Sequence, residues 1–140
     1  MNDTQISTEL TRHQVRPSIQ RIQIYRFLDK NRIHPTVDEI FIKIHKIIPT
    51  LSRMTVYNTV NLFAEKGILH PVIIEDNELR YDIDTTFHGH FKCEQCGMVS
   101  DIFNIKDPLL AADLAGHIIR HKHLYYIGTC KKCSVITKTL

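Results

Sequence analysis

The sequence predicts an α+β protein in two parts, an N-terminal winged helix-turn-helix domain and a small α/β domain after it. Three observations lead to this prediction. Helical periodicity dominates the first half of the 140 residues, and two short apolar runs follow it. Strand-like runs dominate the second half, which also holds all four cysteines as two Cys-x-x-Cys pairs. We place the domains at residues 1–83 and 84–140.

Three helices are expected in the first domain. The first lies within residues 18–31, and the second begins at the capping box Thr36-Val-Asp-Glu39 and ends at Pro49. The third starts after a possible N-cap at Ser52 and closes at Gly67, a left-handed cap. The apolar positions expected to pack are Ile19, Ile22, Phe27 and Leu28 in the first helix and Val37, Ile40, Phe41 and Ile44 in the second. Residues 68–74 and 79–83 then read as a hairpin, which completes the order of a winged helix.

The third helix has two contrasting faces. Val56, Val60 and Phe63 cluster on one side at 100° per residue. The opposite side carries Arg53, Tyr57, Asn58 and Asn61. A cation for phosphate or guanine and amides that pair with adenine edges suit the major groove of DNA, whereas a solvated helix face more often carries Glu and Lys.

The charge distribution fits contact with a polyanion. Residues 1–74 hold ten Lys or Arg against six Asp or Glu, a net charge of +4, whereas the remainder has a net charge of −1. Arg12, Arg16 and Arg21 lie near the start of the first domain and are candidates for contacts with the DNA backbone, or are simple surface charges.

The four cysteines predict a structural zinc site. Cys93, Cys96, Cys130 and Cys133 supply four thiolates from two knuckles, which close a tetrahedral shell and leave no position for a substrate. The alternatives are two disulfides, a redox dithiol or unrelated buried thiols. Around these knuckles we expect a strand, a knuckle and a strand over residues 91–104. A helix from Asp107-Pro108 through Ala115, which stops at Gly116, and a last strand over residues 123–128 follow.

A second metal site is indicated just before the first knuckle. His88 and His90 are two residues apart, so on a strand they point to the same side. Asp82 precedes them and Asp101 follows the knuckle, and nitrogen and oxygen ligands together suit Fe²⁺, Mn²⁺ or Zn²⁺.

The composition argues against a membrane protein. The chain is 43% hydrophobic and 24% charged, no stretch reaches the length of a membrane span, and residues 1–14 are polar and mixed in charge. We therefore expect a cytoplasmic protein without a signal peptide or anchor.

Several short motifs together resemble the ferric uptake regulator family. They are His34-Pro35-Thr36, Thr55-Val56-Tyr57, Arg80-Tyr81-Asp82, His88-x-His90 and the two Cys-x-x-Cys pairs, and they cover nearly the whole chain. The resemblance implies a winged helix that binds double-stranded operator DNA, a C-terminal domain that forms a homodimer, and a regulatory metal at the hinge. Carried over, the regulatory ligands are His34, Asp82, His88, His90 and Asp101. The expected DNA contacts are Arg16, Arg21, Arg53, Thr55, Tyr57, Asn58 and Asn61.

Details of the motifs resemble the peroxide-stress branch of this family. Asp82 stands where iron-uptake members usually carry Glu, and Gly89 and Lys122 stand where a third metal site would need ligands. The resemblance implies a repressor that senses hydrogen peroxide through Fe²⁺ or Mn²⁺, with His34 and His88 as the histidines open to oxidation. The usual Arg-x-Thr-Pro-Gln-Arg motif is here residues 16–21 with its proline displaced.

Other interpretations stay open at this point. The closest alternative is a regulator of iron, manganese or zinc homeostasis that senses metal occupancy alone. Two alternatives belong to other classes: a zinc hydrolase using His88, His90 and an aspartate, and a zinc-stabilised dimer whose winged helix binds protein. The hydrolase lacks an obvious general base and leaves the polar face of the third helix unexplained, and we do not expect an enzyme. His117, His121 and His123 are expected to be surface or packing residues.

Overall fold

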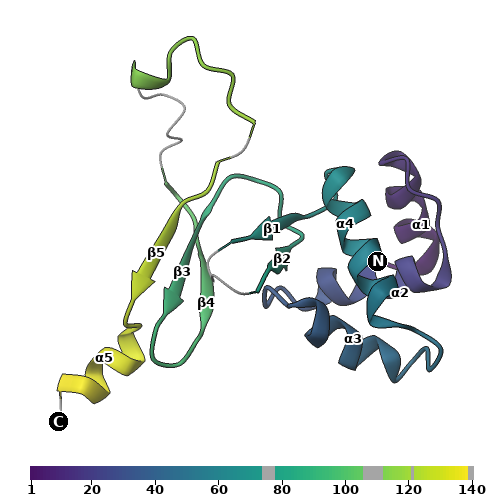
Figure 1. Cartoon of the computed structure of the whole chain (residues 1–140), viewed down its shortest axis with the longest axis horizontal. Coiled ribbons are helices and arrows are strands. Elements are labelled where there is room, and N and C mark those ends of the chain that lie inside the picture. Colours follow the sequence, from purple (N-terminus) through teal and green to yellow (C-terminus); the bar gives the residue numbers. More distant parts are fainter. Residues whose placement is uncertain (74–77, 106–111, 121, 139–140) are drawn as a thin grey trace. The chain divides into compact units, whose positions relative to one another are not determined.

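The computed structural model describes residues 1–73, 78–105, 112–120 and 122–138. The chain divides into two compact units, Met1–Thr85 and Thr86–Leu140. Figure 1 labels their helices and strands. No helix within the described ranges has the length and apolar character needed to cross a membrane.

Unit 1 consists of four helices and a two-stranded sheet. The elements are α1 (Asp3–Arg12), α2 (Ile19–Lys30), α3 (Val37–His45), α4 (Arg53–Glu65), β1 (His70–Val72) and β2 (Arg80–Asp82). The strands pair antiparallel, with His70 opposite Asp82. Helices α2 to α4 followed by this hairpin form the predicted winged helix-turn-helix. The predicted turn of the hairpin falls mainly on residues 74–77, outside the described residues.

Local side-chain chemistry sets the helix boundaries. Thr36 accepts a hydrogen bond from the backbone N–H of Glu39, and the Glu39 carboxylate accepts one from that of Thr36, which is the predicted capping box. At α4 the Ser52 side chain accepts a hydrogen bond from the Thr55 N–H, and Gly67 after the end of the helix has a φ of +76°. Helix α3 ends at His45, so the predicted end at Pro49 was too late.

One hydrophobic core holds unit 1 together. Its most deeply buried side chains are those of Ile6, Leu10, Ile24, Leu28, Ile40, Val56, Val60 and Phe63. The prediction that Ile19 packs was wrong, because its side chain is 72% exposed at the first position of α2. Helix α1 was not predicted, although Asn2 and Gln5 form a capping box there and Ile6 and Leu10 fill one side of the core.

Unit 2 is built on a three-stranded sheet. The strands are β3 (Gly89–Cys93), β4 (Val99–Ile102) and β5 (Tyr125–Gly128), in the order β4-β3-β5. Strand β3 runs antiparallel to β4 and parallel to β5. Helix α5 (Lys131–Lys138), which was not predicted, follows the sheet. The predicted helix from Asp107 lies partly outside the described residues; its described end is a single 3₁₀ turn, η2 (Ala112–Leu114), before Gly116.

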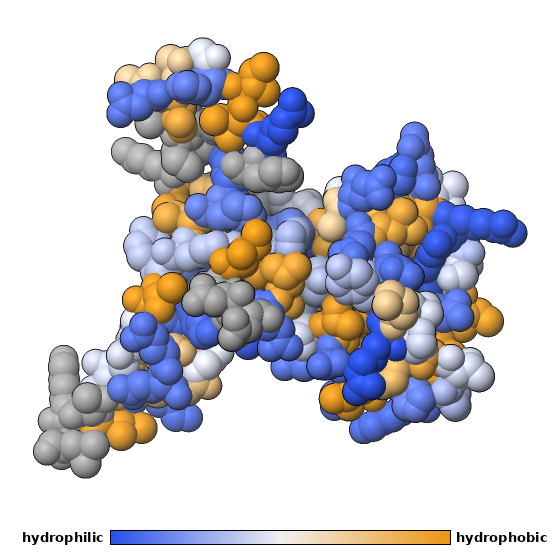
Figure 2. Space-filling view, viewed as in Figure 1, coloured by the Kyte–Doolittle hydropathy of each residue, from blue (hydrophilic) through white to orange (hydrophobic). Residues whose placement is uncertain are grey.

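Unit 2 has little apolar core of its own. Among its described residues, the buried apolar side chains are those of Cys93 and Cys130. Many larger ones are exposed instead: Met98, Phe103, Tyr126, Ile127, Val135 and Ile136. Figure 2 shows such hydrophobic surface among the polar patches of the visible face. A unit this small needs a further source of stability, such as a bound metal or a second chain.

Candidate metal centres and nucleic-acid interface

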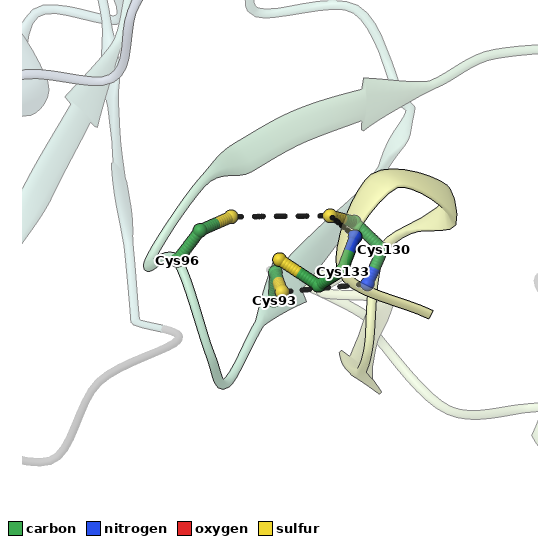
Figure 3. Close-up of side chains that lie close together, drawn as sticks. All are labelled: Cys93, Cys96, Cys130 and Cys133. Atoms are coloured by element: carbon green, nitrogen blue, oxygen red, sulfur yellow. Dashed lines mark hydrogen bonds between the residues drawn. The ribbon is translucent and has the colours of Figure 1, made fainter. Parts of the chain in front are cut away.

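The ends of strands β3 and β5 bring the four cysteines together. Cys93 ends β3, and the turn after it is closed by a hydrogen bond from the Gly97 N–H to the Cys93 carbonyl at 3.0 Å. Cys130 lies between β5 and α5, and Cys133 lies in the first turn of α5 (Figure 3). The four sulfur atoms lie within 4.8 Å of one another, and all four cysteines are free thiols rather than disulfides.

Backbone amides prepare this cluster for thiolates. The Cys130 N–H donates to the Cys93 sulfur at 3.3 Å, and the Cys133 N–H donates to the Cys130 sulfur at 3.4 Å (Figure 3). Hydrogen bonds from the backbone of Cys96 and Cys130 lower the pKa of the Cys93 thiol to about 6. Contact with the Cys130 side chain, followed by burial, raises the pKa of Cys133 to about 12.

The opposed pKa shifts of Cys93 and Cys133 favour a single thiolate, that of Cys93, in the metal-free cluster. Four thiolates this close together would repel one another. A divalent ion that accepts four sulfur ligands removes the repulsion, and Zn²⁺ prefers this tetrahedral shell. The cluster is therefore a structural zinc site, with no open position for chemistry.

A second group of metal-binding side chains lies on the sheet of unit 2. The Nε2 atoms of His88 and His90 are 3.2 and 3.3 Å from Oδ1 of Asp101. Strand pairing explains the contact, because His90 lies directly opposite Asp101 in the β3–β4 register. Both histidines are buried, and the Asp101 side chain is 20% exposed.

The position of the proton on His88 suits a cation site. Its Nδ1 lies 2.8 Å from the Thr86 carbonyl oxygen, which can only accept, so Nδ1 carries a proton. In a neutral ring the Nε2 lone pair then faces the carboxylate of Asp101 at 3.2 Å, an arrangement that either a second proton on the ring or a metal ion between the two atoms stabilises. A backbone carbonyl behind a ligating histidine is the usual support for a metal ligand.

Unit 1 carries a matching pair, His34 and Asp82. The His34 Nε2 lies 3.3 Å from Asp82 Oδ2, and both side chains are only 3% exposed. The other carboxylate oxygen, Oδ1, accepts a hydrogen bond from the Asp84 N–H at 2.9 Å, which orients Oδ2. His34 has a φ of +56°, an uncommon conformation for a residue with a side chain. Its carbonyl accepts from Arg80, and the neighbouring Pro35 carbonyl accepts from the Tyr81 N–H, so β2 holds this loop in place.

His70 was not among the predicted ligands, but it lies beside this pair. Its Nε2 is 4.0 Å from Asp82 Oδ2, because the hairpin register places the two residues opposite each other. The pairing of the two predicted strands was the only sequence signal for this proximity. Of the three unassigned histidines, His117 is exposed, His121 falls outside the described residues, and Nδ1 of His123 is 3.0 Å from the Tyr125 hydroxyl.

Helix α4 presents the predicted polar face. Val56, Val60 and Phe63 are fully buried, whereas Arg53, Tyr57, Asn58 and Asn61 are exposed. Thr55 is half-buried, and its Oγ1 lies 2.9 Å from Ser52 Oγ at the start of the helix. Arg53 contacts α3: its Nε donates to Asp38 at 2.8 Å, and its guanidinium lies 4.4 Å from the centre of the Phe41 ring.

A groove in unit 1 joins this face to the start of α2. It has a volume of about 500 Å³ and is lined by Arg16, Pro17, Ser18, Gln20, Arg21, Thr55, Asn58 and Thr59. Arg21 donates to the Arg16 carbonyl at 2.7 Å, which holds its guanidinium at the entrance to the helix. The structure thus brings Arg16, Arg21, Thr55 and Asn58 to one cavity.

Comparison with known proteins places the chain in a family. The model of the ferric uptake regulator family matches residues 12–127. The chain belongs to the ferric uptake regulator family. It is 34% identical over 130 residues to the peroxide-responsive repressor PerR of Staphylococcus saprophyticus, covering 90% of this chain and 87% of that protein. PerR of Staphylococcus aureus is 34% identical over 123 residues, covering 85% and 82%.

Solved structures of the family share the fold. The peroxide stress regulator of Campylobacter jejuni superposes with a TM-score of 0.65 at 26% identity and covers 95% of this chain and 100% of its own. The ferric uptake regulator of Helicobacter pylori superposes with a TM-score of 0.72 at 19% identity, with 94% and 90% coverage. The predicted family and the predicted fold, a winged helix followed by a dimerisation domain, are confirmed.

Proposed function

We propose that this protein is a cytoplasmic, metal-dependent transcriptional repressor that binds operator DNA as a homodimer and senses hydrogen peroxide. The observation that carries the proposal is the pair of histidine–aspartate groups, one in each unit. Membership of the family and 34% identity to peroxide-responsive repressors support a regulatory role rather than a catalytic one.

The DNA-binding role is assigned to unit 1, which contains the predicted DNA-binding domain, residues 1–83. Arg16, Arg21 and Arg53 are cations for the phosphate backbone, while Tyr57, Asn58 and Asn61 are exposed on α4, where a recognition helix reads base edges. Thr55 lines the same groove as the two N-terminal arginines.

The regulatory ion is assigned to five side chains: His34 and Asp82 from unit 1, and His88, His90 and Asp101 from unit 2. The geometry within each unit supports this, because each group directs histidine Nε2 atoms at a carboxylate oxygen. Three histidine nitrogens and two carboxylates suit Fe²⁺ or Mn²⁺. An ion bound by both units favours one relative arrangement of them, so metal binding biases the protein towards the DNA-binding state.

The oxidation step is assigned to His34 or His88. The five side chains would hold Fe²⁺, which would supply the redox chemistry for this step. In the overall reaction an imidazole C–H would gain one oxygen atom from hydrogen peroxide, and water would leave. His88 is held by the Thr86 carbonyl and His34 by its strained backbone and the Arg80 contact, so both rings keep a fixed aim at the site. An oxidised ring no longer offers the same nitrogen lone pair, and the bias towards DNA binding is lost.

Dimerisation is assigned to unit 2. Its sheet and α5 border an apolar groove of about 870 Å³, lined in part by Phe91, Met98, Ile102 and Ile136. Burial of this surface by a second copy would add the apolar core that the unit lacks.

The test is peroxide treatment of zinc-replete protein loaded with Fe²⁺ without oxygen and bound to DNA from its own promoter region. Fluorescence anisotropy should show metal-dependent binding and release of the DNA after peroxide. Trypsin then separates the histidines: peptide 33–43 holds His34, peptide 81–92 holds His88 and His90, and peptide 67–80 holds His70. None of the three contains Met or Cys, so a gain of one oxygen atom in the first two reports histidine oxidation directly.

Protein loaded with Mn²⁺ is the control and should keep both its DNA and its mass. If the Fe²⁺ form also keeps both, peroxide sensing is wrong, and the protein senses metal occupancy alone. If neither form binds DNA at moderate salt, the repressor assignment is wrong. In that case hydrolytic activity that depends on His88 would favour a zinc hydrolase.

A further inference from the structure

Helix α4 exposes a continuous stripe that includes a residue outside the expected DNA contacts. Met54, Tyr57, Asn58 and Asn61 are spaced i, i+3, i+4 and i+7, so they share one side of the helix. All four are exposed, Met54 at 65% and Tyr57 at 48%. The opposite side is packed into the core through Val56 and its neighbours.

Met54 occupies the leading position of this stripe because Arg53 is directed elsewhere. Arg53 is bonded to Asp38 and stacked over Phe41, both on α3. The side chain that the first turn of α4 presents along the stripe is therefore the thioether of Met54. The N-terminal residues of a recognition helix are the ones that reach base edges in the major groove.

The chemistry of Met54 suits one feature of the major groove. A single exposed methionine is ordinary on a protein surface, but this one continues a row formed by a phenol and two amides. In the major groove, the apolar feature on a base edge is the C5-methyl group of thymine. Methionine is unbranched and polarizable, so it adapts to such a methyl group at little steric cost.

We propose that Met54 is a specificity-determining residue that reads a thymine methyl group in each half-site of the operator. The inference rests on the proposed DNA-binding function and adds to it a preference for T·A at one position. Asn58 and Asn61, further along the stripe, present amides that pair with adenine edges.

The experiment uses a duplex selected from a random-sequence library by the Mn²⁺-loaded wild-type protein. Each thymine is replaced by deoxyuridine at symmetric positions in both half-sites, which removes only the methyl group. For wild type we expect one position at which affinity falls roughly fourfold per half-site, the effect of one buried methyl group. In Met54→Ala this loss should disappear at that position alone, while losses at other thymines persist. Met54→Leu should retain it.

Ile118→Ala is the control, because Ile118 is also an exposed apolar side chain, at 86%, but lies in unit 2 and does not line the groove assigned to dimerisation. It should show the wild-type profile. Zinc content and thermal stability of all variants should equal wild type, since both side chains are at the surface. An unchanged uracil profile in Met54→Ala, or a wild-type protein insensitive to every uracil, overturns the role of Met54 while DNA binding stands. Failure of the wild type to select any sequence overturns the proposed function as well.

Discussion

Replacement of Cys93 by serine tests whether zinc supplies the stability of unit 2. Cys93 is fully buried at the end of β3, and its sulfur accepts the Cys130 N–H at 3.3 Å. Serine keeps the size of the side chain but removes a thiolate, and a hydroxyl is a poor ligand for zinc. The shell would then have three sulfur ligands.

The expected magnitude follows from the site and its surroundings. A structural zinc site contributes about 10–16 kcal/mol at pH 7, so the loss of one ligand in four should weaken zinc binding about 10²–10³-fold. Unit 2 cannot compensate, because Cys93 and Cys130 are the buried apolar side chains among its described residues. Unit 1 has a separate core and should stay folded.

Two measurements check this expectation. Competition with a chromogenic chelator gives the zinc affinity, and limited proteolysis followed by mass spectrometry locates unfolding. Proteolytic cleavage of the Cys93→Ser protein should concentrate in unit 2, which begins after Thr85. The control is Lys132→Ala, an exposed position between Cys130 and Cys133, which should keep zinc and resist proteolysis. A Cys93→Ser protein that holds one equivalent of zinc with wild-type affinity would refute the structural role of the site.

Three further predictions concern protons, packing and the regulatory ligands. Because the pKa of Cys93 is lowered to about 6, zinc binding at pH 7 should release fewer than four protons. At pH 5, where Cys93 regains its proton, zinc binding should release more protons than at pH 7. An indicator dye in weak buffer measures the released protons, and a release of four protons at both pH values would contradict the prediction. Gly89→Ala should lower the free energy of unfolding by about 1 kcal/mol in thermal melts. The reason is crowding, because the new Cβ would lie 2.8 Å from Ile105 Cδ1 and 3.4 Å from the Leu124 carbonyl oxygen. An unchanged melting temperature would argue against this crowding. Asp101→Asn should weaken Mn²⁺ binding at least tenfold in electron paramagnetic resonance titrations, because Nε2 of both His88 and His90 loses an anionic partner. Asp113→Asn, an exposed control, should not weaken Mn²⁺ binding.

The parts of the fold that depend on neighbours in sequence were predictable. The capping box at Thr36, the N-cap at Ser52 and the left-handed Gly67 each act over a few residues, so the start of α3 and both ends of α4 lie where expected. The same holds for the two cysteine knuckles. Helix α1 was missed because its signal, the Asn2 and Gln5 capping box, stands in a polar segment with few apolar residues.

The contacts of the candidate sites depend on strand pairing and helix packing instead. His70 approaches Asp82 through the β1–β2 register, and Arg53 is held by Asp38 and Phe41 on the preceding helix. Neither contact has a sequence spacing that signals it. Packing also decided which apolar residues are exposed: Ile19 fits the helical period of α2 yet lies at the surface.

The sequence by itself determined the family, the order of the winged-helix elements and the residue types suited to bind metal, because these depend on local hydrogen bonding and on the ligand chemistry of Cys, His and Asp. Only the tertiary structure decided how those side chains are directed. The proton on His88 Nδ1 follows from the Thr86 carbonyl, and the lowered pKa of Cys93 follows from backbone amides of both knuckles. These side-chain directions come from backbone N–H and C=O groups that folding brings together. The sequence does not signal them, because almost every residue type carries the same backbone groups.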